Sequence, residues 1–243
     1  MHVLVVTAVP AERDAVTRAF GDVSEVAVRE VPGAQVHRVG GTGGPGGSGV
    51  VDVLAGGVGP AAAAAATAFG LASAPYDLVV SAGIGGGFAP VAPVGSLVVA
   101  SGIVGADLGA ETPEGFVPVT GLGFGRDRFT PAPAQVRDVA AATGALTGEI
   151  LTVSTVTGSA ERVAALLAAH PQAAAEAMEG FGVAEAAERT GVPVLELRAV
   201  SNAVGPRDRN AWRIGEALAA LTGAFGKIVP VLEGWTHHDR HDS

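Results

Sequence analysis

One stretch of the sequence decides the fold: Glu176-Ala-Met-Glu-Gly-Phe-Gly-Val-Ala-Glu-Ala-Ala187, which is followed by an apolar run over residues 192–200 and by Ser201-Asn202. An apolar segment turns into a helix at Glu179, and Asn202 stands where the next strand ends. In open α/β sheets, ligands bind at such strand ends. The stretch therefore predicts an α/β protein with a binding site near Glu179 and Asn202.

Outward from this stretch, apolar runs and helical patterns alternate along the chain. This alternation predicts a mostly parallel sheet covered by helices. No segment has the composition of a linker, so we expect one domain over residues 1–234 and a polar tail over 235–243. Strands are expected at 2–6, 50–55, 77–82, 96–104, 148–156 and 193–200, and helices at 10–20, 61–72, 133–142, 159–169, 178–190 and 208–232. An antiparallel pair is expected at 23–31 and 34–39, a hairpin tip at 40–49, and irregular chain at 105–130.

Composition excludes several function classes. The net charge of −9 and the lack of any basic cluster disfavour nucleic acid as a partner. The absence of cysteine excludes disulfides and zinc–thiolate sites. The N-terminus does not resemble a signal peptide, and the longest apolar run, residues 61–74, is too short to cross a bilayer. We expect a cytoplasmic protein with no membrane partner.

Two glycine-rich segments, residues 56–59 and 83–87, each follow a predicted strand. Glycines there allow a ligand to approach backbone N–H groups closely, although tight turns would explain them equally well. Neither segment matches the dinucleotide-binding fingerprint, and a Walker-type lysine is absent because Lys227 is the only lysine in the chain.

Three polar residues are candidates for chemistry. Glu12 lies near a helix start, where its carboxylate could take a proton from water, or could simply complement the helix dipole. Glu179 is a carboxylate among small apolar residues, and a ribose diol would donate two hydrogen bonds to it; otherwise it is a solvated helix acid. The Asn202 amide can both donate to and accept from a purine edge; the alternative is an asparagine that caps a turn. Glu176 is expected to be exposed.

Taken together, these residues resemble the nucleoside phosphorylase/nucleosidase superfamily. The resemblance spans nearly the whole chain and rests on the turn at Glu12, on Ser81-Ala-Gly-Ile-Gly-Gly-Gly87, on Ala177-Met-Glu-Gly180 and on Arg198-Ala-Val-Ser-Asn202. It implies a single α/β domain with a mixed, barrel-like central β-sheet flanked by helices. It also implies cleavage of an N-glycosidic bond in a small-molecule nucleoside, a homo-oligomer, and no need for a cofactor or metal.

Within the superfamily, the chain is similar to the 5′-methylthioadenosine/S-adenosylhomocysteine nucleosidases. That resemblance implies that Glu12 activates the attacking water, that Met178 and Glu179 hold the ribose, and that the main chain near Ile84 and Gly85 lines the site. Those nucleosidases carry Asp at the position of Asn202, where it protonates the adenine leaving group. Asparagine cannot be that acid, and its amide instead suits a 6-oxopurine.

The segments Thr152-Val-Ser-Thr-Val-Thr-Gly-Ser159 and Ser201-Asn-Ala-Val-Gly-Pro-Arg-Asp-Arg-Asn-Ala-Trp-Arg-Ile214 look like those of the futalosine hydrolase branch. This similarity implies release of hypoxanthine from futalosine in menaquinone biosynthesis. Thr155 and Val156 fall where the nucleosidases place a base-stacking aromatic residue, which fits a changed base pocket.

Three alternatives stay open. A purine nucleoside phosphorylase should place several arginines near the glycine-rich segments, yet only Arg13 lies near the first strand. An adenine nucleosidase and a non-catalytic nucleoside-binding protein are the others. Candidates to pair a carboxylate at the 5′ side of the substrate are Arg126, Arg128, Arg207 and Arg209.

Overall fold

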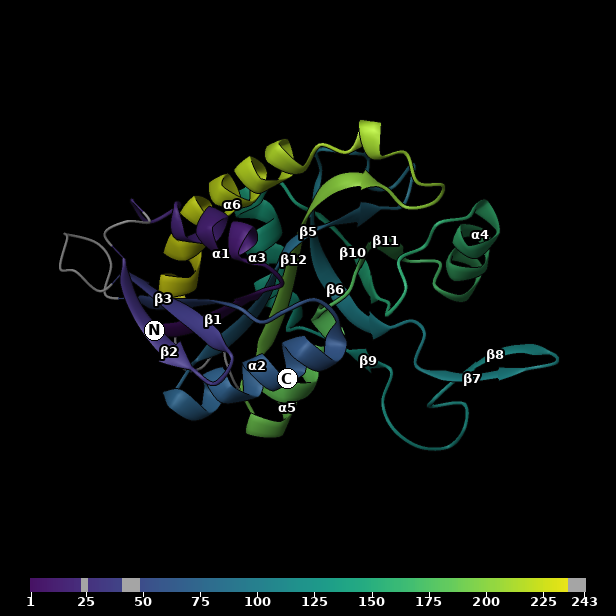
Figure 1. The fold of residues 1–243 in the computed structure, drawn as a ribbon, viewed down its shortest axis with the longest axis horizontal. Coiled ribbons are helices and arrows are strands. Elements are labelled where there is room, and N and C mark those ends of the chain that lie inside the picture. Colours follow the sequence, from purple (N-terminus) through teal and green to yellow (C-terminus); the bar gives the residue numbers. More distant parts are fainter. Residues whose placement is uncertain (23–25, 41–48, 236–243) are drawn as a thin grey trace.

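The computed structural model describes residues 1–22, 26–40 and 49–235, and Figure 1 shows how their helices and strands are arranged. The strands are β1 (His2–Thr7), β2 (Ala27–Val31), β3 (Ala34–Gly40), β4 (Val50–Ala55), β5 (Leu78–Gly87), β6 (Leu97–Gly105), β7 (Gly109–Thr112), β8 (Gly115–Pro118), β9 (Arg128–Phe129), β10 (Leu146–Thr152), β11 (Ala173–Ala177) and β12 (Val194–Ala203). The helices are α1 (Pro10–Thr17), α2 (Pro60–Ser73), α3 (Pro133–Thr143), α4 (Ala160–Ala169), α5 (Gly180–Thr190) and α6 (Ile214–Gly234).

The central sheet is mixed and partly closed. Its strands follow the order β11-β10-β6-β12-β5-β1-β4-β3-β2, and β11 also pairs with β5. That extra pairing is antiparallel and joins five strands, β5, β12, β6, β10 and β11, into a ring. The expectation of a single α/β domain with a barrel-like sheet is confirmed.

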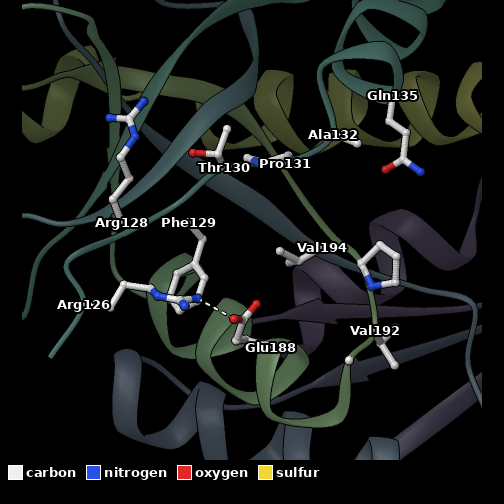
Figure 2. A pocket seen from close by; sticks show the side chains of 12 residues that line it. Arg126, Arg128, Phe129, Thr130, Pro131, Ala132, Gln135, Glu188, Val192 and Val194 are labelled. Carbon is white, nitrogen blue, oxygen red and sulfur yellow. Dashed lines mark ion pairs between the residues drawn. The ribbon is translucent and has the colours of Figure 1, made fainter. Parts of the chain in front are cut away.

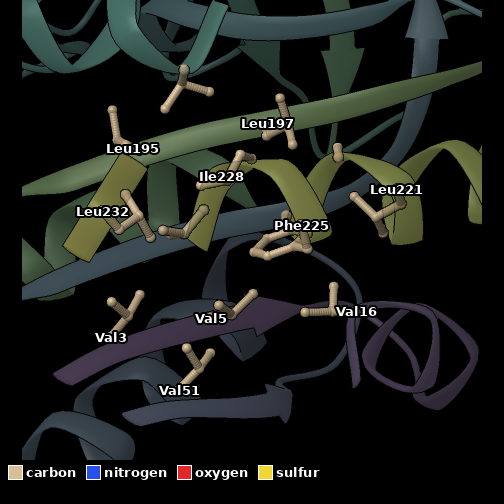
Figure 3. Packing of buried hydrophobic residues seen from close by; sticks show 14 of the residues in the cluster. Val3, Val5, Val16, Val51, Leu195, Leu197, Leu221, Phe225, Ile228 and Leu232 are labelled. Atoms are coloured by element: carbon tan, nitrogen blue, oxygen red, sulfur yellow. The ribbon is translucent and has the colours of Figure 1, made fainter. Parts of the chain in front are cut away.

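Helices cover both faces of the sheet: α1, α3 and α6 lie on one side, and α2 and α5 on the other (Figure 1). Pro10 and Pro60 each begin a helix, where a missing N–H costs nothing. Leu221, Phe225 and Ile228 of α6 point at the sheet, where they pack with strand residues such as Val5 and Leu197 (Figure 3). Each such side chain, fully buried, contributes about 1.5–3 kcal/mol.

By length and composition, the segment Arg209–Leu232 could cross a membrane, and in the described residues it is the one helix that could. Its apolar side chains have a different explanation in this fold. Ala217, Leu221, Ala224, Phe225, Ile228 and Leu232 recur at helical spacing and are all buried in the core.

The elements differ from the sequence-based expectation at five places, the first of which is a strand that was not predicted. Residues 173–177 form strand β11, and residues 83–87 continue strand β5 instead of forming a loop. Strand β10 ends at Thr152, and the segment expected to be irregular contains the β7–β8 hairpin. Trp235, assigned to the polar tail, is buried, and its indole N–H donates to Asp138 at 3.2 Å. The rest of the tail, 236–243, and the hairpin tip at 41–48 lie outside the described residues.

Candidate active site

A cavity of about 350 Å³ opens where β1, β5, β11 and β12 end. Every site residue expected from the sequence lines it except Thr155; these are Glu12, Ile84, Gly85, Val156, Met178, Glu179 and Asn202. Their convergence follows from the sheet order: β12 pairs along one edge of β5, while β1 and β11 pair with the other edge, β1 near the start of β5 and β11 at its end.

Glu12 is fixed by backbone donors at the start of α1. Its Oε2 accepts from the N–H of Ala8 at 2.9 Å and of Val9 at 3.3 Å, and its Oε1 accepts from the N–H of Ile84 at 2.9 Å. Burial raises the pKa of this carboxyl, while Arg198 and the N–H groups of Ile84 and Ala8 oppose the rise. The carboxylate is therefore both held in place and made a stronger base than a solvated glutamate.

Arg198 also belongs to the site, although the sequence alone assigned it no role. It is 1% exposed on β12, and its Nη1 donates to Glu179 at 3.3 Å, its Nε to Glu196 at 2.9 Å and its Nη2 to Ser81 at 2.9 Å. The sequence did contain a signal, because an arginine inside an apolar strand must find partners when it is buried.

Glycine at position 83 brings Arg198 close to Glu12. A Cβ there would lie 2.7 Å from Arg198 Nη1 and 2.7 Å from Glu12 Oε1, so any side chain would push the two apart. Glu12 therefore lies close to the same buried guanidinium that pairs with Glu179.

Glu179 lies at the N-terminus of α5 and is 5% exposed. Its Oε1 accepts from Gly59 N–H at 3.3 Å, and its Oε2 accepts from Arg198 and from Met178 N–H, both at 3.3 Å. These are long hydrogen bonds, which leaves the carboxylate able to accept from two adjacent hydroxyl groups of a ligand.

Behind Arg198 lies Glu196, a carboxylate with no exposure to solvent. Burial raises its pKa to about 7, against the opposing effect of Arg198. Its carboxyl fills the place of a side chain at Gly180, where a Cβ would lie 2.1 Å from Glu196 Oε2. Gly180 is therefore required by the carboxyl that supports Arg198.

Asn202 and Glu176 also line the cavity. Ser201 Oγ donates to Asn202 Oδ1 at 2.8 Å, and Asn202 Nδ2 donates to Ala203 O at 3.0 Å, which leaves the second amide N–H available to a ligand. Glu176, expected to be exposed, is only 4% exposed and lines the cavity, because it belongs to the strand β11 that the sequence reading missed.

Two of the arginines proposed to bind a substrate carboxylate lie elsewhere. Arg126 and Arg128 line a separate cavity of about 440 Å³, where Arg126 pairs with Glu188 at 2.7 Å (Figure 2). Arg128 pairs with Glu149. Arg207 is nearer the candidate site, since its guanidinium lies 5.5 Å from the ring of Trp212, which lines that cavity.

Comparison with known proteins agrees with this geometry. The family model described as "Phosphorylase superfamily" matches residues 2–229. Futalosine hydrolase from Streptomyces coelicolor is 63% identical over 99% of this chain and 100% of its own length. Futalosine hydrolase from Acidothermus cellulolyticus is 44% identical over 93% of this chain and 89% of its own.

Solved structures show the same fold. A nucleosidase from Colwellia psychrerythraea, which acts on 5′-methylthioadenosine and S-adenosylhomocysteine and was solved with adenine, has a TM-score of 0.76 at 25% identity, covering 96% of this chain and 93% of its own. Futalosine hydrolase of Helicobacter pylori has a TM-score of 0.79 at 18% identity, covering 94% of this chain and 97% of its own. The chain belongs to the phosphorylase superfamily and, within it, to the futalosine hydrolase family.

Proposed function

We propose that this protein hydrolyses the N-glycosidic bond of futalosine and releases hypoxanthine and dehypoxanthinyl futalosine. One observation carries the proposal: Glu12, Arg198 and Glu179 form a buried, pre-arranged set beside a cavity of nucleoside size, in a chain 63% identical to a futalosine hydrolase. The futalosine hydrolase name of that relative supports a place for the reaction in menaquinone biosynthesis.

In the reaction, charge builds on the sugar while the bonding electrons move to the base. Glu12 takes a proton from water as the oxygen of that water bonds to C1′, a role worth about 10²–10⁴-fold in rate. Glu179 accepts hydrogen bonds from the ribose hydroxyls and stabilises the developing positive charge. Asn202 donates to the purine as the C1′–N9 bond breaks, which stabilises the departing base.

The charge of the cavity supports water, not phosphate, as the nucleophile. Three carboxylates, Glu12, Glu176 and Glu179, line it, and its described lining includes no lysine or arginine. The buried Arg198 already pairs with Glu179 and Glu196. A phosphate dianion would face this negative lining without a free cation, whereas a neutral water would not be repelled.

The test is a base-release assay with purified protein and no phosphate, on futalosine, inosine, methylthioadenosine and S-adenosylhomocysteine. We expect hypoxanthine from futalosine, with the largest kcat/KM of the four and no increase when phosphate is added. Dependence on phosphate would identify a phosphorylase, and preferred release of adenine would identify an adenine nucleosidase. Binding with no turnover of any substrate would support a non-catalytic protein.

We further propose a cytoplasmic homo-oligomer. The support for the oligomer lies in the β7–β8 hairpin and the chain after it, which project from the domain (Figure 1) and expose Phe116, Leu122 and Phe124 by 44%, 40% and 63%. Where exposed apolar side chains form a contiguous patch, they mark protein contacts. Light scattering of the purified protein should give at least twice the mass of one chain, and a monomer would contradict this. Recovery of the protein outside the cytoplasmic fraction of cells would contradict the location.

A further inference from the structure

The cavity contains one buried carboxylate that the proposed mechanism does not use. Glu176 accepts from the backbone N–H of Thr157 at 2.9 Å through Oε1 and from the Thr157 hydroxyl through Oε2. A carboxylate has about four lone-pair sites, so these two bonds leave capacity on both oxygens. Because Glu176 lines the cavity, that capacity is available to a ligand.

The sheet places Glu176 and Asn202 on either side of Gly86. Glu176 is the register partner of Gly86 across β11 and β5, and Asn202 is its partner across β12 and β5. Register partners point to the same face of a sheet. Neighbouring strands lie about 4.8 Å apart, so the two Cα atoms are separated by roughly 10 Å, with the glycine between them.

Because residue 86 is a glycine, no side chain stands between Glu176 and Asn202. A Cβ at this position would lie 2.9 Å from Val204 Cγ2 and 3.3 Å from Asn202 Nδ2. The amide of Asn202 therefore lies close to Gly86. The strip of backbone between Asn202 and Glu176 carries no side chain at this position. A flat heterocycle can lie on this strip with one polar group on each side.

We propose that Glu176 is a specificity-determining residue for the base: its carboxylate accepts the ring N1–H of a 6-oxopurine, while the Asn202 amide donates to the neighbouring carbonyl oxygen O6. The inference rests on the proposed function, since it takes the purine to be bound beside Asn202. The two side chains together present an acceptor and a donor, which match the donor and acceptor on that edge of hypoxanthine.

A 6-aminopurine presents the opposite pattern. Its unprotonated N1 would direct a lone pair at the Glu176 carboxylate, and its amino group would direct a donor at the Asn202 N–H. A site built to hydrogen-bond a substrate N–H rejects an analogue that lacks it, because the buried groups of the site are left unpaired. Thr157 strengthens this effect, since its two donors hold the carboxyl group of Glu176 in one orientation and oppose the rise in its pKa that burial causes.

The test is Glu176→Gln. The amide has the same size and can still accept from Thr157 N–H, but it has no negative charge. We expect kcat/KM for futalosine to fall about 10- to 100-fold, the range for losing a hydrogen bond to a charged group. For the 6-amino analogue of futalosine, kcat/KM should stay level or rise, so the ratio between the two substrates narrows. Calorimetry with free hypoxanthine and free adenine should show the same narrowing without any turnover.

Glu149→Gln is the matched control. Glu149 is also a buried carboxylate on a central strand, but it pairs with Arg128 and lies outside this cavity. This variant should keep the wild-type preference for hypoxanthine. If Glu176→Gln does not fold, Glu176→Asp replaces it: the shorter carboxylate keeps its charge but withdraws from the base, and hypoxanthine affinity alone should fall.

The outcomes separate this inference from the proposed function. If the wild type cleaves futalosine and the Glu176 variants discriminate between the two bases as the wild type does, Glu176 does not set specificity and the function stands. If the wild type fails to cleave futalosine but prefers hypoxanthine to adenine, and Glu176→Gln loses that preference, the function is wrong and Glu176 stands. A wild type that binds adenine more tightly overturns the inference.

Discussion

At the scale of single residues, the site depends on how Glu12 is held. Its two oxygens accept from three backbone N–H groups, and Arg198 lies close to it beside Gly83. Glu12→Gln keeps the size of the side chain but removes the base, so we expect kcat to fall about 10²–10⁴-fold. KM should change little, because ribose binding is assigned to Glu179. Steady-state kinetics on futalosine measure both constants, and a near wild-type kcat would remove Glu12 from the mechanism.

The raised pKa of Glu12 adds a pH dependence to the same prediction. The base is active only as a carboxylate, so activity should rise with pH as Glu12 ionises. Because burial raises its pKa above the usual 4.5, the acid limb of kcat/KM should lie above pH 4.5. The residual activity of Glu12→Gln should lack that limb. An unchanged limb in the variant would show that another group titrates.

Sequence reasoning found the residues whose position could be inferred from one strand end, and it missed those that depend on packing. Glu12, Glu179 and Asn202 could be placed because each stands beside a strand or helix terminus. Arg198 lies inside a strand, so its contact with Glu179 depends on which neighbour β12 pairs with. Glu176 was expected to be exposed because nothing local shows that its strand is covered on both faces.

At the scale of elements, the missed strand β11 reads Ala-Ala-Ala-Glu-Ala, and alanine is the best helix former. Its pairing with β10 and β5 overrides that propensity, and pairing partners so distant in sequence cannot be read locally. The glycines of β5 led to a second error, because they predicted a loop where the chain continues as a strand. A Cβ at Gly85 would lie 2.8 Å from Glu176 O, so this strand contains glycine to let β11 approach, and not to form a loop.

The contact between α2 and α5 gives a test at this scale. A Cβ at Gly182 of α5 would lie 2.0 Å from the carbonyl oxygen of Pro60, the first residue of α2. Gly182→Ala should therefore push the two helices apart and cost about 1–3 kcal/mol of unfolding free energy. Because Gly59, just before α2, donates to Glu179, we also expect KM to rise.

Urea unfolding and kinetics measure the two effects. Gly226→Ala is the control, since nothing lies within 4 Å of a Cβ at that position in α6. Replacing this helical glycine should leave KM unchanged and stabilise the protein by up to about 1 kcal/mol. A Gly182→Ala protein as stable as the wild type would show that the helices separate without cost.

At the scale of the whole molecule, the buried acids fall into two groups whose contributions to stability change with pH in opposite directions. Asp52, buried at the N-terminal part of the sheet, accepts from Arg38 at 2.8 Å, from Arg29 at 2.9 Å and from Tyr76 at 2.6 Å, which hold its pKa well below the usual 3.8. In the site, burial raises the pKa of Glu12, Glu176 and Glu196 above 4.5.

These pKa shifts determine whether the free energy of unfolding rises or falls with pH. Asp52 binds fewer protons folded than unfolded, so its contribution is present above pH 3.8 and is lost as the pH falls further. The site acids bind more protons folded than unfolded, so stability falls as the pH rises from 4.5 towards about 7, where Glu196 ionises. Self-repulsion at a net charge of −9 acts in the same direction.

We therefore expect the protein to unfold at a higher urea concentration at pH 5 than at pH 7.5. Glu196→Gln should reduce this difference, because glutamine can still accept from Arg198 Nε but cannot ionise, so the cost of a buried charge near pH 7 disappears. Any loss of stability that is the same at both pH values cancels when the two urea midpoints of one protein are subtracted. A wild type more stable at pH 7.5 than at pH 5, or a variant with the full wild-type difference, would contradict the assignment of that cost to Glu196.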